Sequence, residues 1–117
     1  MITIEDFKKG EITVGKILTV EIVEGSEKLL KLSVDFGEDL PAGPGRRGNL
    51  RTVVSGIRKY FEEPQTLVGV KCAFATNLEP RPLMGLTSEA MILAVSSDNY
   101  FSLLQVSDGV EPGARVK

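Results

Sequence analysis

The chain has 117 residues, of which 42% are hydrophobic and 26% are charged, and its formal net charge is −2. This length and composition predict a single globular domain, residues 1–117, and exclude a disordered chain. Because the sequence contains no histidine and only one cysteine, it lacks the most common general base and cannot form an internal disulfide.

The N-terminal residues predict a short helix over residues 3–9. Thr3 and Asp6 have the spacing of a capping pair, and Ile4 and Phe7 lie on one face, which we expect to plug one end of the fold. The same residues lack the apolar core of a signal peptide, and no apolar run approaches the roughly 18 residues of a membrane span. We therefore expect a cytoplasmic location and no membrane partner.

Two strands joined by a turn at Gly25-Ser26 follow. Alternation over Ile12–Ile22 predicts a half-buried strand, and Gly15 within it predicts a bulge. The second strand, Leu30–Phe36, is expected to pair with the first as an antiparallel hairpin. The inward-facing residues of these strands are predicted to be Ile12, Val14, Leu18, Val20, Ile22, Leu30, Leu32, Val34 and Phe36.

The segment Gly37–Asn49 is rich in glycine and proline, which predicts a flexible loop. Its tip carries Arg46 and Arg47. One interpretation is a solvated, variable loop, and the other is a mobile basic finger that reaches a phosphate backbone. A third strand, Leu50–Ser55, is predicted directly after it.

Irregular helical turns are predicted over Ile57–Leu67, with Tyr60 or Phe61 closing the bottom of a barrel. A fourth strand alternates through Val70, Cys72, Phe74 and Leu78, a fifth covers Met91–Val95, and Leu103–Val106 forms a C-terminal β extension. Cys72 is expected to be a small buried thiol. Five principal strands, with a helical connection between the third and the fourth, describe an all-β OB-fold, which is a small, partly open barrel.

The segment Asn77–Ala94, NLEPRPLMGLTSEAMILA, joins the fourth and fifth strands. Arg81 between two prolines, followed by methionines and a serine, suits contact with another molecule better than chemistry. The chain has no phosphate-loop, dinucleotide or nucleophile-elbow motif, and Ser88-Glu89 has no histidine partner. Asp35 with Glu38-Asp39 is more typical of a solvated acidic loop than of a cation site. We predict no catalysis, no cofactor and no metal.

Six segments, in this order, are similar to one family: DFKKGEITVGKI, SEKLLKLSVDFGE, RTVVSGIRKYF, NLEPRPLMG, SEAMILA and EPGARV. The chain resembles the tRNA-binding domain that occurs free-standing in bacteria, at the C-terminus of many bacterial methionyl-tRNA synthetases, and in a eukaryotic synthetase-associated cytokine precursor. This resemblance implies an OB-fold, dimerisation through strands near the chain ends, and structure-specific, largely sequence-independent binding of tRNA.

The resemblance also implies which residues contact RNA: Lys28, Asn77, Arg81, Ser88 and Met91. Lysine and arginine neutralise phosphates, asparagine and serine can bond to backbone or 2′-hydroxyl groups, and methionine offers an adaptable apolar contact. A turn cap is the alternative role for Ser88, and a core or dimer position is the alternative for Met91.

Three departures from the family pattern bear on this surface. Thr13 replaces a basic residue in the first strand, Glu89 changes the common SQGM corner to SEAM, and the loop over residues 37–49 is longer than usual. Our hypothesis is that Arg46 and Arg47 restore some of the positive potential that the first two changes remove.

The predicted function is a tRNA-binding module, working alone or with a methionyl-tRNA synthetase catalytic subunit. The alternative is an export-related chaperone on the same fold that binds unfolded polypeptide, which the acidic pI of 5.2 and exposed Leu83, Met84 and Leu86 would suit. A homodimer is expected under both functions, because a barrel this short leaves apolar strand edges.

Overall fold

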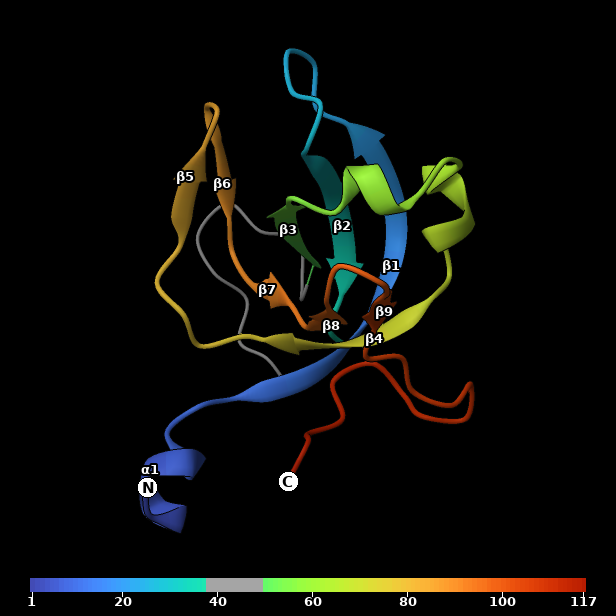
Figure 1. Ribbon diagram of the computed structural model, residues 1–117. Helices are drawn as coiled ribbons and strands as arrows, with labels where there is room; N and C mark the ends of the chain where they lie inside the picture. Colours follow the sequence, from blue (N-terminus) through green and yellow to red (C-terminus); the bar gives the residue numbers. More distant parts are fainter. Residues whose placement is uncertain (38–49) are drawn as a thin grey trace.

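A computed structural model of the protein describes residues 1–37 and 50–117 (Figure 1). Its elements are α1 (Ile4–Lys8), β1 (Ile12–Ile22), β2 (Leu30–Asp35), β3 (Leu50–Ser55), the 3-10 turns η1 (Arg58–Tyr60) and η2 (Pro64–Leu67), β4 (Lys71–Ala75), β5 (Arg81–Leu83), β6 (Leu86–Ser88), β7 (Met91–Ile92), β8 (Ala94–Ser96) and β9 (Phe101–Leu103). The predicted basic finger with Arg46 and Arg47 lies outside the described residues. Within them, no helix is long and apolar enough to cross a membrane.

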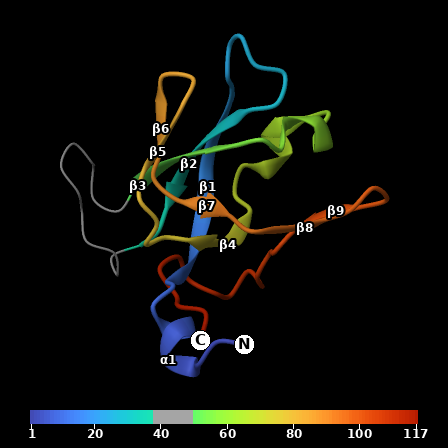
Figure 2. The same cartoon turned by 60° about the vertical axis from the view of Figure 1, so that its left-hand side comes forward.

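One antiparallel sheet of five strands, in the order β3-β2-β1-β4-β7, curls into a half-barrel (Figures 1 and 2). Two small hairpins, β5–β6 and β8–β9, extend from it. The two ends of the curled sheet approach each other, because the backbone N–H of Glu89 beyond β6 donates to the carbonyl oxygen of Thr52 on β3 at 2.8 Å. The protein is therefore mostly β, with little helix.

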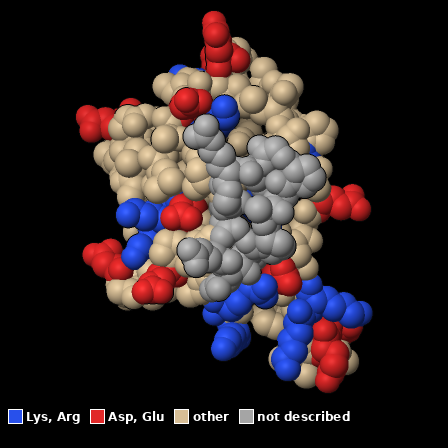
Figure 3. Space-filling view, turned by 180° about the vertical axis from the view of Figure 1, so that it is seen from behind, with Lys and Arg blue, Asp and Glu red and all other residues tan. Residues whose placement is uncertain are grey.

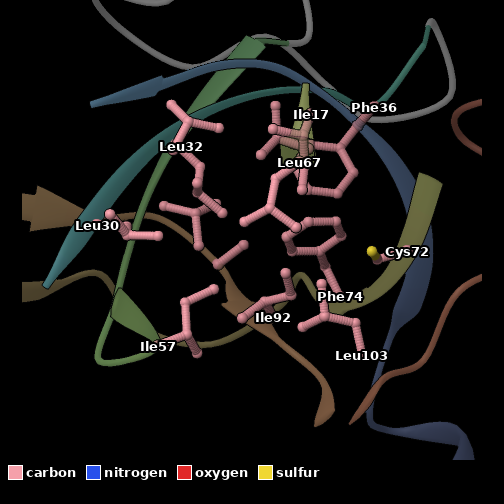
Figure 4. Close-up of a cluster of buried hydrophobic side chains, with 14 residues drawn as sticks. Ile17, Leu30, Leu32, Phe36, Ile57, Leu67, Cys72, Phe74, Ile92 and Leu103 are labelled. Atoms are coloured by element: carbon pink, nitrogen blue, oxygen red, sulfur yellow. The ribbon is translucent and has the colours of Figure 1, made fainter. Parts of the chain in front are cut away.

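Side chains from the concave face of the sheet form the core (Figure 4). The alternation predicted for the second strand is confirmed, since Leu30, Leu32, Val34 and Phe36 are all fully buried. The ring of Phe36 meets that of Phe74 edge-on at 5.2 Å between centroids. This aromatic pair packs against β1 at Gly15, on the core side of the sheet.

The pattern predicted for β1 is wrong in part. Leu18 and Ile22 are exposed, whereas Ile17 is fully buried. One extra residue shifts the pairing of β1 with β2 between Ile17 and Thr19, so that Ile17 faces the core and Leu18 does not. Beyond the shift, Val20 lies opposite Leu32 and is buried as predicted, whereas Ile22 is exposed at the end of the strand. We predicted the bulge at Gly15, but the irregularity lies further along the strand, between Ile17 and Thr19.

The apolar face of α1 does not plug the fold, which corrects the prediction for the N-terminal segment. Thr3 and Asp6 form the capping box at its start, but Ile4 and Phe7 are 60% and 48% exposed. Figure 1 shows α1 beyond the end of the sheet, whose concave face is already filled by its own side chains. The helix therefore leaves an apolar stripe in solvent.

The later strands differ from the predicted ones in extent. The predicted fifth strand is divided between β7, which joins the main sheet, and β8, which pairs with β9. β9 overlaps the strand predicted over residues 103–106 only at Leu103. Leu78 is exposed, because β4 ends at Ala75. Phe61 packs against the core, and Tyr60 stacks on Phe101 at its edge.

Cys72 on β4 is the buried core thiol that the sequence predicts. Burial disfavours the thiolate and raises the pKa of Cys72 to about 11. The thiol therefore stays protonated at neutral pH, which makes it a poor nucleophile.

Candidate functional site

The segment between β4 and β7 contains a hairpin, an element that the sequence analysis did not predict. β5 and β6 pair through Arg81 opposite Ser88 and Leu83 opposite Leu86. Met84 and Gly85 form the turn with φ angles of 48° and 79°, and positive φ at both central residues is typical of the tightest hairpin turns. The hairpin stands out from the curled sheet (Figure 1). The side chain of Arg81 on β5 is exposed.

The tip of this hairpin lies against the β1–β2 loop, residues 23–29. The terminal methyl carbon of Met84 is 3.7 Å from the position that a Cβ atom would occupy at Gly25. Met84 is nevertheless 60% exposed. Two loops that are distant in the sequence therefore form one continuous, partly apolar edge of the molecule.

Internal hydrogen bonds hold the β1–β2 loop in shape. The hydroxyl oxygen of Ser26 accepts from the backbone N–H groups of Lys28 and Leu29 at 3.2 and 3.1 Å. Arg58 of η1 donates from its backbone N–H to the carbonyl oxygen of Lys28 at 3.1 Å, and from Nη1 to the carbonyl oxygen of Ser26 at 2.5 Å. The exposed side chain of Lys28 therefore projects from a braced loop.

Sequence reasoning missed Arg58, although it lies within the SGIRKYF motif that supported the resemblance. No local pattern marks it, because its hydrogen-bond partners are on the distant β1–β2 loop. The pairing of η1 with this loop is visible only in the folded chain.

Ser88 is only 3% exposed, so its side chain is buried. Its hydroxyl accepts from the backbone N–H of Val54 at 2.9 Å and donates to the carbonyl oxygen of Ala90 at 3.0 Å. Glu89 also contacts β3, since its Oε1 accepts from the N–H of Thr52 at 3.1 Å. Both side chains thus attach the hairpin to β3. For Ser88, this structural role is closer to the turn cap that we gave as its alternative role.

Asn77 is exposed, but its side-chain amide is engaged with the segment that follows α1. Its Nδ2 donates to the carbonyl oxygen of Lys9 at 2.5 Å, and its Oδ1 accepts from the N–H of Glu11 at 2.8 Å. Met91 on β7 is 42% exposed, so it is available for contact rather than part of the core. Of the predicted contact residues in the described part of the chain, Lys28, Arg81 and Met91 have exposed side chains that are not engaged in hydrogen bonds with other described residues.

The surface charge is mixed, and the candidate cations lie outside its ion pairs. Seen from behind, acidic and basic side chains alternate, with Lys and Arg gathered at the lower edge (Figure 3). Among the described residues, no carboxylate lies within 4.0 Å of Lys28, Arg58 or Arg81, whereas Lys31 pairs with Glu21 at 3.6 Å. Unpaired cations beside a hydrogen-bonded loop can bind an anion without first breaking an internal contact.

A family model described as "Putative tRNA binding domain" matches residues 12–115. The methionine–tRNA ligase of Caldanaerobacter subterraneus subsp. tengcongensis is 40% identical over 115 residues, which cover 98% of this chain and 16% of that protein. The chain thus spans about a sixth of the length of this relative.

Two solved structures extend the comparison. The MetRS related protein from Pyrococcus horikoshii is 30% identical, with a TM-score of 0.85 and coverage of 100% of this chain and 98% of that one. The CsaA chaperone protein from Picrophilus torridus is 25% identical, with a TM-score of 0.82 and full coverage of both chains.

Proposed function

The chain belongs to the tRNA-binding domain family, and on this premise we propose that it is a non-catalytic module that binds tRNA by its structure rather than by its sequence. The match over residues 12–115 carries the proposal. The exposed cations Lys28 and Arg81, on the β1–β2 loop and the β5–β6 hairpin, supply the chemistry that a phosphate backbone requires. In this role the protein contributes affinity and leaves catalysis to a partner.

We propose that the fold is an OB-fold barrel. Five strands curl in the order β3-β2-β1-β4-β7, and Ser88 and Glu89 join the far end of the sheet to β3. Folds of this kind bind oligonucleotides on an outer face framed by loops. The β1–β2 loop and the β5–β6 hairpin provide such a frame here.

Within this frame, Lys28, Arg81 and Met91 contact the RNA directly. Ser88 and Asn77 act indirectly, by positioning other parts of the chain. Ser88 attaches the hairpin to β3, and Asn77 holds residues 9–11. We retain Arg46 and Arg47 as further phosphate contacts in the proposal. Replacing both with alanine and titrating with tRNA tests this, and an unchanged affinity would exclude them.

Titration with bulk tRNA at two salt concentrations tests the function itself. With roughly four phosphate contacts, affinity is expected to fall about two orders of magnitude between 50 and 200 mM salt. Arg81→Gln should weaken binding about tenfold at the lower salt, because the variant neutralises one phosphate fewer and so releases fewer counterions when it binds. Lys59→Gln, at an exposed position of η1, is the matched control and should change little. No tRNA binding by the wild-type protein at 50 mM salt would refute the proposal.

The alternative function is chaperone-like binding of unfolded polypeptide. It is favoured by exposed apolar side chains, Leu78 and Met84 among them, and by the likeness to the CsaA chaperone protein. Such binding would depend on apolar contact and would be almost indifferent to salt. An unfolded polypeptide run in parallel with tRNA therefore separates the two functions.

We propose a homodimer whose interface includes both chain ends. Ile4 and Phe7 of α1 and Val116 line a groove of about 450 Å³ that also carries Lys8, Arg115 and Lys117. The segment of residues 94–112 exposes Val95, Tyr100 and Leu104, and its only charged residues are acidic, Asp98, Asp108 and Glu111. An acidic, apolar segment of a second copy complements the basic, apolar groove of the first.

Light scattering at micromolar concentration is expected to give the mass of a dimer. Phe7→Ser should shift the protein toward monomer, because it removes apolar area from the interface. Met84→Ser, at a similarly exposed apolar position on the far hairpin, should leave the mass unchanged. A wild-type monomer under these conditions would contradict the proposal.

We further propose that the module works in the cytoplasm and assists a methionyl-tRNA synthetase catalytic subunit. The relatedness to methionine–tRNA ligases supports this. Co-elution of the protein with such a subunit on size exclusion tests the partnership, and separate elution of the two at micromolar concentration would argue against it.

A further inference from the structure

The backbones of Lys28 and Arg58 are linked by a hydrogen bond, although the two residues are far apart in the sequence. The N–H of Arg58 donates to the carbonyl oxygen of Lys28 at 3.1 Å. The side chain of Lys28 is exposed, and that of Arg58 is partly exposed. Two cationic side chains therefore start from neighbouring backbone positions on the edge that the β1–β2 loop forms with η1.

Only part of the hydrogen-bonding capacity of Arg58 is used within the protein. Its Nη1 donates to the carbonyl oxygen of Ser26 at 2.5 Å. A guanidinium carries five N–H donors in a planar fork. No described residue accepts from the remaining donors of Arg58 or pairs with its charge, and the same holds for the ammonium of Lys28. Their bonding capacity therefore remains for a ligand.

We infer that Arg58 and Lys28 together form one binding site for a phosphate group of the RNA backbone. The bond to Ser26 fixes the plane of the guanidinium, which can then meet phosphate oxygens through its other N–H groups, while Lys28 adds a mobile point charge. This inference rests on the proposed function and names two of its contacts, of which Arg58 comes from outside the predicted set.

The bracing of the loop explains how the site binds without a large ordering penalty. Ser26 and Arg58 hold the backbone around Lys28 by four hydrogen bonds in the free protein. An ordered site loses less conformational entropy when the ligand arrives, so more of the electrostatic attraction remains as affinity. Arg58 thus acts both as a brace and as a ligand-binding side chain.

The neighbouring Lys59 serves as an internal control because its side chain makes a different contact. Its Nζ is 5.1 Å from the centroid of the Tyr60 ring, which stacks on Phe101 of β9 at 4.0 Å. Lys59 therefore lies over the Tyr60 ring, whereas Arg58 is hydrogen-bonded to the β1–β2 loop. The two residues differ in environment but not in charge.

The experiment compares Arg58→Gln with Lys59→Gln in titrations with bulk tRNA over a series of salt concentrations. Arg58→Gln should weaken binding about tenfold at 50 mM salt and reduce the slope of log affinity against log salt by about 1. Lys59→Gln should change affinity less than about twofold, since a charge outside the contact releases no bound counterion. The double variant with Lys28→Gln should lose less than the sum of the single effects, because both side chains share one phosphate.

Urea unfolding of each variant separates binding from bracing. If Arg58→Gln lowers affinity and stability but leaves the salt slope at its wild-type value, Arg58 is only a brace and the inference is wrong. Equal effects of Arg58→Gln and Lys59→Gln would also overturn it. If the wild-type protein binds no tRNA, the proposed function fails, whereas tRNA binding that ignores Arg58 refutes this inference alone.

Discussion

Gly15→Ala should lower the free energy of unfolding by about 2 to 3 kcal/mol, near the upper end for overpacking a core. A Cβ atom at this position of β1 would lie 2.5 Å from Cγ1 of Val34, 2.7 Å from Cε1 of Phe36 and 3.0 Å from Cε1 of Phe74. All three side chains are fully buried. Because they are packed on every other side, none can move away without displacing the rest of the core.

Urea unfolding of Gly15→Ala measures this loss. Gly109→Ala is the matched control, because nothing lies within 4 Å of a Cβ atom built there. The control should stay within about 0.5 kcal/mol of the wild-type protein, as surface substitutions usually do. A Gly15→Ala protein as stable as the control would show that the aromatic pair has room to shift, contrary to the packing described above.

Arg51→Met should destabilise the protein by about 3 kcal/mol, because it removes a buried, charged hydrogen-bond donor. Arg51 on β3 is 9% exposed. Its Nη1 donates to the carbonyl oxygen of Thr76 at 2.7 Å and to that of Glu89 at 3.4 Å. The guanidinium also lies 5.6 Å from the centroid of the Phe36 ring. Its loss removes the side-chain donor that bonds the carbonyl oxygen of Thr76 where β3 meets the end of the sheet.

Arg51→Lys distinguishes the hydrogen bonds from the charge. A lysine keeps the charge but lacks the planar fork, so we expect it to recover less than half of the lost stability. Lys31→Met is the control, since its pair with Glu21 is solvent-exposed and such pairs contribute about 0–1 kcal/mol. If the methionine variants at positions 51 and 31 unfold at the same urea concentration, the buried hydrogen bonds of Arg51 do not contribute the stability expected here.

Sequence motifs could propose candidate site residues, but they could not show which of these residues are exposed. The SEKLL and NLEPR motifs pointed to Lys28 and Arg81; the first is exposed on the β1–β2 loop and the second is exposed on β5. Ser88 belongs to a similar motif, yet it is buried against Val54. A motif shows that a residue matters to a family without showing whether it faces a ligand or a neighbouring strand. That distinction depends on which strand lies opposite.

The sequence by itself determined the β-rich class, the burial pattern of β2, the bounds of β3 and the family, because each depends on local alternation or on several motifs in order. The tertiary structure alone decided the outward turn of Leu18, the exposed face of α1, the β5–β6 hairpin and the junction of Arg58 with Lys28. These features arise from pairing between segments that are distant in the chain. The free energy of such pairing comes from contacts that no single segment contains, so no local pattern can specify it.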